Sequence, residues 1–201
     1  MHHIMLETVG LPLVLLIGAY LLGSLSSAIL LCKLAGLPDP RSQGSGNPGA
    51  TNVLRFGGKK LAATVLLLDV LKGTLPVLLA ALLGVTMDWL AAIALAAFLG
   101  HLYPVFFEFK GGKGVATALG GLLALSPLLA LTILATWLVV FLVSRISSLS
   151  AIVAATLAPM YSFWFLDTTP ARWILIVMAL LLLYRHKSNI QRILSGEETK
   201  P

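Results

Sequence analysis

The chain has 201 residues, of which 58% are hydrophobic and 11% are charged, and its formal net charge is +6. An ordinary soluble domain is about 25% charged, so this composition excludes a disordered chain and argues against a soluble globular domain. Because the hydrophobic residues form several long runs, a soluble body with a single membrane anchor is excluded as well. The sequence predicts an all-α integral membrane protein.

Seven apolar segments follow one another along the chain, and most have the roughly 20 residues that a spanning helix needs. They cover residues 11–36, 60–84, 87–107, 113–125, 127–144, 148–166 and 170–186. The fourth segment is short and opens with glycines, so we expect a half-helix or a re-entrant segment there. Since no repeat or low-complexity linker divides the chain, we expect one domain over residues 1–201, a seven-helix bundle with one short or broken helix.

The basic residues orient this bundle. With the N-terminus outside and seven crossings, the inner loops and the helix ends beside them hold nearly all of the basic residues: Arg41, Arg55, Lys59, Lys60, Lys110, Lys113, Arg145, Arg185, Lys187, Arg192 and Lys200. Only Arg172 falls in an outer loop. This asymmetry follows the positive-inside rule, and it predicts that the glycine-rich loops lie on the cytoplasmic side.

The first of these loops, residues 44–52, is rich in glycine and precedes Arg55. Glycines such as Gly46 let the backbone approach a ligand closely, and the guanidinium of Arg55 suits phosphate. Further side-chain donors come from Ser45, Asn47, Thr51 and Asn52. The loop also matches G-x-G-x-x-G, but prolines precede it where a dinucleotide-binding fold has a strand. We expect a phosphate site here; a flexible surface turn is the alternative.

Two charged residues lie inside the second apolar segment. Asp69 and Lys72 are three positions apart, so they can pair with each other on one helical face. Intramembrane charges are costly and point to function by default, but we favour a buried ion pair that braces the glycine-rich loop. His101 can orient the next loop by hydrogen bonding.

The second glycine-rich loop, residues 110–114, opens the short fourth segment. Free N–H groups and the helix dipole make a helix start an anion site, which would involve Gly111, Gly112 and Gly114, with Lys113 over the site as a cation. The loop is not a P-loop, because Phe107 stands where the motif requires glycine. The alternative, a glycine cluster for helix packing, suits Gly120 and Gly121 better.

A third polar group ends the last apolar segment. His186 and Asn189 are three positions apart, so we expect them on one helical face; an interfacial anchor is the alternative reading of the histidine. Ser147, Ser148 and Ser150 either face the same region or cap a helix.

Together these motifs resemble the bacterial acyl-phosphate-dependent glycerol-3-phosphate acyltransferases. The resemblance runs in order from about residue 23 to 192 and rests on Gly23-Ser24, Asp39-x-Arg41, residues 44–55, Asp69-x-x-Lys72-Gly73-x-x-Pro76, Gly100-His101-x-x-Pro104, residues 110–117 and Arg185-His186-x-x-Asn189-Ile190. The chain departs from the family pattern at Ser26, where members often have proline, and at Ala151, where they have serine.

The resemblance implies an enzyme of the bacterial inner membrane with a periplasmic N-terminus and a cytoplasmic active site. It would move a fatty acyl group from acyl phosphate to the 1-hydroxyl of sn-glycerol 3-phosphate, giving lysophosphatidic acid and phosphate, the first step of phospholipid synthesis. The expected partners are glycerol 3-phosphate, acyl phosphate, membrane lipid and, through functional coupling, the enzyme that makes acyl phosphate. We expect no cofactor, no metal and no nucleic acid.

On this basis we assign catalytic roles to His186, Lys113 and Ser45. The expected substrate-binding residues are Gly46, Asn47, Thr51, Asn52, Arg55, Gly111, Gly112, Gly114 and Asn189. Either His186 or an oxygen of the acyl phosphate takes the hydroxyl proton; we favour an orienting role, with His186 donating a hydrogen bond and Asn189 beside it. A transporter for a phosphorylated metabolite is the rival, but its site belongs near the bilayer midplane. A non-catalytic scaffold would leave both glycine-rich loops unexplained.

Overall fold

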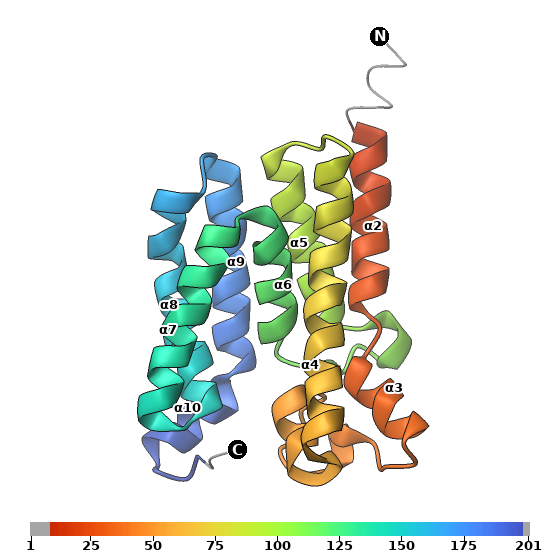
Figure 1. The fold of residues 1–201 in the computed structure, drawn as a ribbon, viewed down its shortest axis with the longest axis vertical. Coiled ribbons are helices and arrows are strands. Elements are labelled where there is room, and N and C mark those ends of the chain that lie inside the picture. Colours follow the sequence, from red (N-terminus) through yellow and green to blue (C-terminus); the bar gives the residue numbers. More distant parts are fainter. Residues whose placement is uncertain (1–8, 199–201) are drawn as a thin grey trace.

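The computed structural model describes residues 9–198, and their regular structure is helical (Figure 1). The α-helices are α2 (Leu11–Gly23), α3 (Ser27–Leu34), α4 (Ala50–Leu82), α5 (Met87–Leu102), α6 (Val115–Leu125), α7 (Pro127–Ser144), α8 (Ser147–Phe165), α9 (Thr169–Arg185) and α10 (Lys187–Leu194). Two short 3-10 turns, η2 (Pro40–Ser42) and η3 (Val105–Phe107), lie in the connecting loops.

All seven predicted apolar segments are helical. Four helices, α4, α5, α7 and α8, are long and apolar enough to cross a membrane. Two bent pairs bring the number to six if each counts as one span: α2 with α3, bent by 43°, and α9 with α10, bent by 56°. The seventh segment is α6, which has only 11 residues. The prediction of a helical membrane bundle with one short or broken helix is therefore confirmed.

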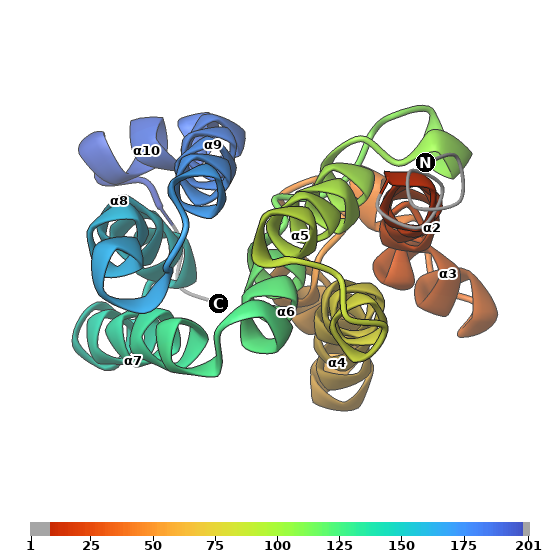
Figure 2. The same ribbon diagram turned by 90° about the horizontal axis from the view of Figure 1, so that it is seen from above.

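The helices form two groups. Figure 2 shows α2 to α6 on one side and α7 to α10 on the other, and the groups meet where α5 faces α9 and α6 faces α7. The start of α2 and the end of α10 lie at opposite ends of the molecule (Figure 1), as an odd number of crossings requires.

Glycines bring α4 and α6 into backbone contact. A Cβ atom on Gly73 would overlap the carbonyl oxygen of Thr117, and one on Gly120 would overlap that of Val70. Thr74 also donates a 2.9 Å hydrogen bond to the Gly120 carbonyl. Such close approach is possible only at small residues, which confirms helix packing as the role of Gly120.

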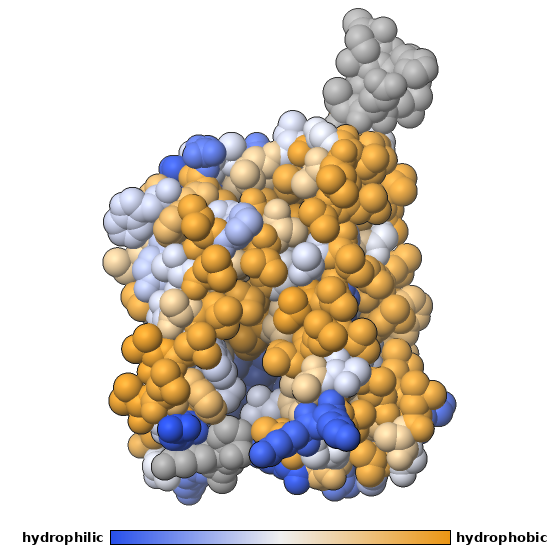
Figure 3. Space-filling view, in the orientation of Figure 1, coloured by the Kyte–Doolittle hydropathy of each residue, from blue (hydrophilic) through white to orange (hydrophobic). Residues whose placement is uncertain are grey.

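The outer surface is mostly hydrophobic, as Figure 3 shows for one face. Large apolar side chains such as Leu82, Val143 and Trp164 are 72–84% exposed, which is expected only where lipid replaces water around the protein. We call the end of the molecule at which α4, α6 and α8 begin, and which carries Arg55, Lys113 and Arg192, the basic end. The protein is an integral membrane protein.

Two helix boundaries differ from the sequence prediction. We expected residues 37–59 to form a loop, but α4 begins at Ala50 and breaks at Gly58, whose φ is +81°. The apolar segment predicted from residue 60 starts after this break, and residues 50–57 form an extra helical piece before it. The last predicted helix ends at Arg185, and the chain bends there into α10.

Candidate active site

A cavity of about 1040 Å³ lies between the two helix groups. Figure 3 shows the molecule hollowed between them near the basic end, with hydrophilic atoms inside the hollow. At that end the lining is polar and includes Ser45, Asn47, Arg55, Lys113, His186 and Asn189. Farther along the helices the lining is apolar, with Leu122, Ile133, Trp137, Ala158 and Leu175. One cavity therefore joins a charged end to a hydrophobic interior.

Three helices begin at the polar end of this cavity. The first residues of α4, α6 and α8 are Ala50, Val115 and Ser147, and all three line the cavity. The first N–H groups of a helix have no partner within it and carry a partial positive charge. Three such ends, together with the side chains of Arg55 and Lys113, make the polar end suited to anions, and to phosphate in particular.

The loop before α4 is held in shape by one buried side chain. Asn52 is 1% exposed, and its Nδ2 donates to the carbonyl oxygens of Pro40 and Gln43 at 2.9 Å each. Its Oδ1 accepts a 2.9 Å hydrogen bond from the N–H of Ser45. These three bonds make Asn52 a support for the loop that presents Ser45 and Asn47. That it also binds substrate stays a prediction.

The second glycine-rich loop packs against the end of α5. The N–H of Gly112 donates to the carbonyl of His101 at 3.1 Å, and Arg185 donates to the carbonyls of Gly111 and Gly112 at 2.6 and 3.1 Å. A Cβ atom on Gly111 would overlap the His101 carbonyl, and one on Gly112 would overlap the His101 ring. Both glycines are thus required for packing.

This packing changes which N–H groups can serve as anion donors. Gly112 already donates to His101, and the first hydrogen bond within α6 runs from Ala118 to Gly114. The N–H groups of Val115 and Ala116, in the first turn of α6, have no acceptor within the helix, and both residues line the cavity beside Lys113 and Gly114. The expectation of free N–H groups at this helix start therefore stays a prediction, with the N–H group of Gly112 removed from it.

The predicted ion pair within α4 is confirmed. Lys72 Nζ lies 2.8 Å from Asp69 Oδ1 and donates to the carbonyl of Leu25, in the break between α2 and α3, at 2.9 Å. His101 Nδ1 lies 3.7 Å from the same carboxylate oxygen and 3.2 Å from Thr117 Oγ1. The buried network therefore joins α4, α5, α6 and the break between α2 and α3. That this network braces the glycine-rich loop stays a prediction.

A chain of hydrogen bonds connects Lys113 to the end of the described chain. Lys113 Nζ donates to Asn189 Oδ1 at 2.5 Å, and Asn189 Nδ2 donates to Glu198 at 2.6 Å. Glu198 also accepts 2.6 Å bonds from Ser148 and Arg192. Glu198 and Arg192 were not among the predicted site residues; the only available sign was an acidic residue close behind a basic helix.

The pKa of Lys113 is lowered to about 8, mainly by burial; the negative charge of Glu198 opposes this shift, and the positive charges of Arg192, Arg185 and Arg55 contribute to it. The cation that faces the cavity is therefore poised to lose its proton slightly above neutral pH.

His186 lies at the bend between α9 and α10 and is 2% exposed. Its Nδ1 is 2.8 Å from the carbonyl oxygen of Leu182. A carbonyl can only accept, so Nδ1 carries the proton and Nε2 is an acceptor when the ring is neutral. His186 is the N-cap residue of α10, and Asn189 lies three positions later in that helix. Both residues line the cavity.

Most of the predicted site residues meet at this cavity. Nine of them line it: Ser45, Asn47, Thr51, Asn52, Arg55, Lys113, Gly114, His186 and Asn189. Gly46 and Gly111 instead border a second cavity of about 350 Å³, together with Arg41, Lys110 and Arg185. Among residues 9–198, no group of three His, Cys, Asp or Glu side chains could hold a metal ion.

The serine segment at the start of α8 faces the same cavity. Ser147 Oγ lies 3.5 Å from Thr51 Oγ1, and Ser148 donates to Glu198. The N-cap residue of α8 is Ile146, and Ser150 donates to its carbonyl at 2.9 Å. Ser147 therefore contacts the other helix group across the mouth of the cavity, whereas Ser148 bonds within its own group, and neither serine is the N-cap residue.

Comparison with known proteins places this geometry in a family. Residues 13–196 match the sequence profile described as glycerol-3-phosphate acyltransferase. The glycerol-3-phosphate acyltransferase of Thioalkalivibrio sulfidiphilus is 59% identical over 189 residues, which cover 92% of this chain and 92% of the relative. That of Shewanella oneidensis is 54% identical over 197 residues, which cover 97% of this chain and 95% of the relative.

Two crystal structures of PlsY (YgiH), an integral membrane glycerol 3-phosphate acyltransferase, are similar to this fold. The glycerol 3-phosphate form has a TM-score of 0.90 at 46% identity and covers 94% of this chain and 95% of its own. The lysophosphatidic acid form has a TM-score of 0.87 at 45% identity and covers 94% of each chain.

Proposed function

This chain belongs to the glycerol-3-phosphate acyltransferase family, and from that premise we propose that it transfers a fatty acyl group from acyl phosphate to the 1-hydroxyl of sn-glycerol 3-phosphate. The products are 1-acyl-sn-glycerol 3-phosphate and inorganic phosphate, and the reaction is the first step of phospholipid synthesis. The observation that carries this proposal is the cavity itself, in which three helix N-termini and a lysine meet an apolar interior. The phosphate of an acyl phosphate suits the polar end of this cavity, and its fatty chain suits the apolar end.

The transfer is direct. The hydroxyl oxygen attacks the carbonyl carbon of the acyl phosphate, the bond from that carbon to the phosphate oxygen breaks, and phosphate leaves with its electron pair. Because phosphate is a good leaving group, the protein mainly positions the two substrates and stabilises negative charge. Arg55, Lys113 and the first turns of α4 and α6 supply positive charge where both phosphates would lie.

The proton of the hydroxyl group goes either to His186 Nε2 or to an oxygen of the acyl phosphate. Because Nδ1 of His186 is bonded to the Leu182 carbonyl, the neutral ring can accept a hydrogen bond at Nε2 but cannot donate one. An orienting His186 therefore accepts from the substrate hydroxyl, which differs from the donating role favoured by sequence alone. Its acceptor nitrogen is compatible with both routes.

The proposed location is the bacterial inner membrane, with the N-terminus in the periplasm and the basic end in the cytoplasm. The positive-inside rule supports this orientation. Soluble glycerol 3-phosphate would then enter from the cytoplasm, and the amphiphilic acyl phosphate would come from the membrane or from functional coupling to the enzyme that makes it.

The direct test is release of inorganic phosphate from palmitoyl phosphate by the purified protein. We expect release that depends on glycerol 3-phosphate and is accompanied by lysophosphatidic acid. Palmitoyl-CoA serves as the control donor and should give no product. Acylation of glycerol 3-phosphate by palmitoyl-CoA, without any use of palmitoyl phosphate, would contradict the proposed donor.

A further inference from the structure

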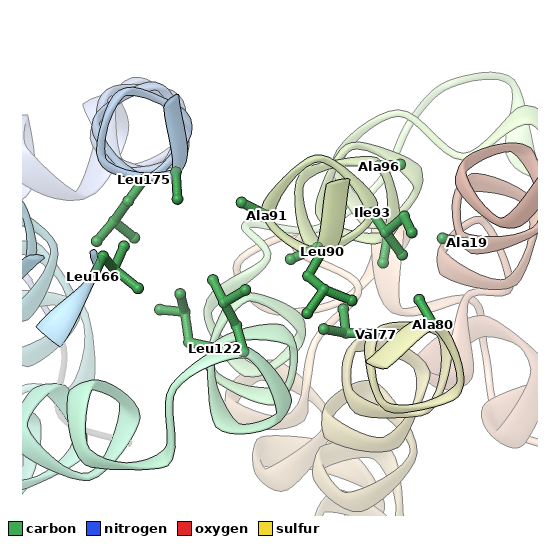
Figure 4. Packing of buried hydrophobic residues seen from close by; sticks show 14 of the residues in the cluster. Ala19, Val77, Ala80, Leu90, Ala91, Ile93, Ala96, Leu122, Leu166 and Leu175 are labelled. Atoms are coloured by element: carbon green, nitrogen blue, oxygen red, sulfur yellow. The ribbon is translucent and has the colours of Figure 1, made fainter. Parts of the chain in front are cut away.

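The apolar end of the cavity is closed by packed side chains. The lining residues farthest from the basic end are Leu122 on α6, Ile133 on α7, Ala158 on α8 and Leu175 on α9. Leu122 and Leu175 are 4% and 3% exposed and belong to the main hydrophobic cluster. In Figure 4, their side chains and that of Leu166 point toward one another between α6 and α9. The cavity therefore has an end wall.

One side of the cavity is made only of small residues. From its first turn onward, α8 lines the cavity with Ser147, Ser148, Ala151, Ala154, Ala155 and Ala158. The large side chains of this helix, such as Met160 and Phe163, are exposed instead. The open volume thus follows α8 from the polar mouth to Ala158.

The length of this wall matches a membrane fatty acid. Ser148 and Ala158 are ten residues apart, which corresponds to about 15 Å along a helix. The hydrocarbon core of a bilayer is about 30 Å thick, so one leaflet, the length of one fatty acyl chain, is about 15 Å. A chain whose phosphate lies at Lys113 would place its terminal methyl group near Ala158.

We propose that Ala158, with Leu122 and Leu175 opposite it, sets the longest acyl chain that this cavity accepts. This inference rests on the proposed function, since it requires an acyl phosphate whose phosphate lies at the basic end. The physical basis is packing: a methylene group beyond the end wall must displace buried side chains, and one surplus methylene in a fitted apolar pocket is enough to change discrimination about tenfold or more.

The test measures kcat/KM for octanoyl, dodecanoyl and palmitoyl phosphate, with phosphate release as the readout. In Ala158→Leu, the larger side chain occupies the end of the cavity, so the ratio of palmitoyl to octanoyl activity should fall about tenfold or more. The matched control is Ala135→Leu on α7, an exposed position outside the cavity lining, which should leave the ratio unchanged.

A second variant tests the opposite direction. Leu175→Ala enlarges the far end, so the ratio of eicosanoyl to palmitoyl activity should rise, which keeps the test decisive if Ala158→Leu does not fold. An unchanged ratio in both variants, or an equal loss for all chain lengths, would overturn the proposal and indicate that the chain leaves the cavity sideways. If the wild-type protein releases phosphate from no acyl phosphate, the proposed function fails and not the chain-length assignment alone.

Discussion

Arg55 and Lys113 reach the polar end of the cavity from the starts of two different helices. Their side chains differ in what they can offer an anion: a guanidinium presents a planar fork that binds two oxygens, whereas an ammonium is a point charge. Two phosphate groups must be held during the proposed transfer. The two cations are therefore not interchangeable, and each leads to a separate prediction.

Arg55→Lys should lower kcat/KM for glycerol 3-phosphate about tenfold or more. Losing one charge-assisted hydrogen bond costs roughly 1.5–3 kcal/mol, which appears as lost transition-state stabilisation. The measurement is steady-state kinetics with palmitoyl phosphate at saturation. Arg145→Lys is the matched control, because Arg145 is exposed and does not line the cavity. An unchanged kcat/KM in Arg55→Lys would remove Arg55 from the site.

The lowered pKa of Lys113, about 8, predicts a pH dependence. Lysine is a cation below its pKa, so the anion-binding charge is present at neutral pH and is lost as pH rises through about 8. We expect kcat/KM for glycerol 3-phosphate, which reports groups of the free enzyme, to fall over this range.

Lys113→Arg keeps its charge throughout and should remove this alkaline limb, even if its overall rate is lower. A limb that persists unchanged in Lys113→Arg would assign it to another group.

His186→Asn should reduce the rate modestly and raise KM, because an amide oxygen can replace Nε2 as a hydrogen-bond acceptor. His186→Ala, whose side chain has no hydrogen-bond acceptor, should raise KM more than His186→Asn does. Kinetics of both variants between about pH 6 and pH 9 distinguish orientation from base catalysis, which contributes about 10²–10⁴-fold. A loss near 10⁴-fold in kcat for His186→Asn, with KM unchanged and the acidic limb gone, would make His186 the general base.

At the level of the elements, the decisive contact is the crossing of α4 and α6. α6 has only 11 residues, so its position depends on neighbours, and the backbones of the two helices touch at Gly73 and Gly120. The same two helices begin at the polar end of the cavity. A shift of one against the other would move both N-termini away from a shared ligand.

Gly120→Ala should destabilise the protein by about 1–3 kcal/mol, because the added methyl group has no space against the Val70 carbonyl. Thermal unfolding in detergent measures this loss as a lower Tm. Gly18→Ala is the matched control, since a Cβ atom on Gly18 in α2 meets nothing within 4 Å. Alanine there should be neutral or slightly stabilising, as alanine is a better helix former than glycine. Equal Tm values for the two variants would contradict the close crossing.

At the level of the whole molecule, the positive-inside rule predicts which end faces the cytoplasm. In a Cys32→Ala background, Ser42→Cys should be labelled by an impermeant thiol reagent only from the cytoplasmic side. Thr86→Cys, in the loop between α4 and α5, should be labelled only from the periplasmic side. Both positions are exposed, so accessibility does not limit labelling. The reverse pattern would overturn the proposed orientation.

The sequence alone determined the helical membrane fold, and it predicted the residues of the candidate site. Lipid admits few backbone arrangements, so the seven apolar segments of the chain already specify helices, and glycine-rich loops beside Arg55 and Lys113 already indicate an anion site. A contact within one helix could also be predicted from the sequence: Asp69 and Lys72, three positions apart, pair as their spacing predicts.

Only the tertiary structure decided how these parts meet. The contact of Lys113 with Asn189 depends on segments brought together from different parts of the chain. The use of the Gly112 N–H by His101, the role of Asn52 as a loop support and the contact of Glu198 with Asn189 depend on the course of irregular turns, which helical periodicity does not predict. The length of the apolar cavity could not be predicted from the sequence, because its walls come from four helices. The periodicity within one helix does not determine its distance from the next.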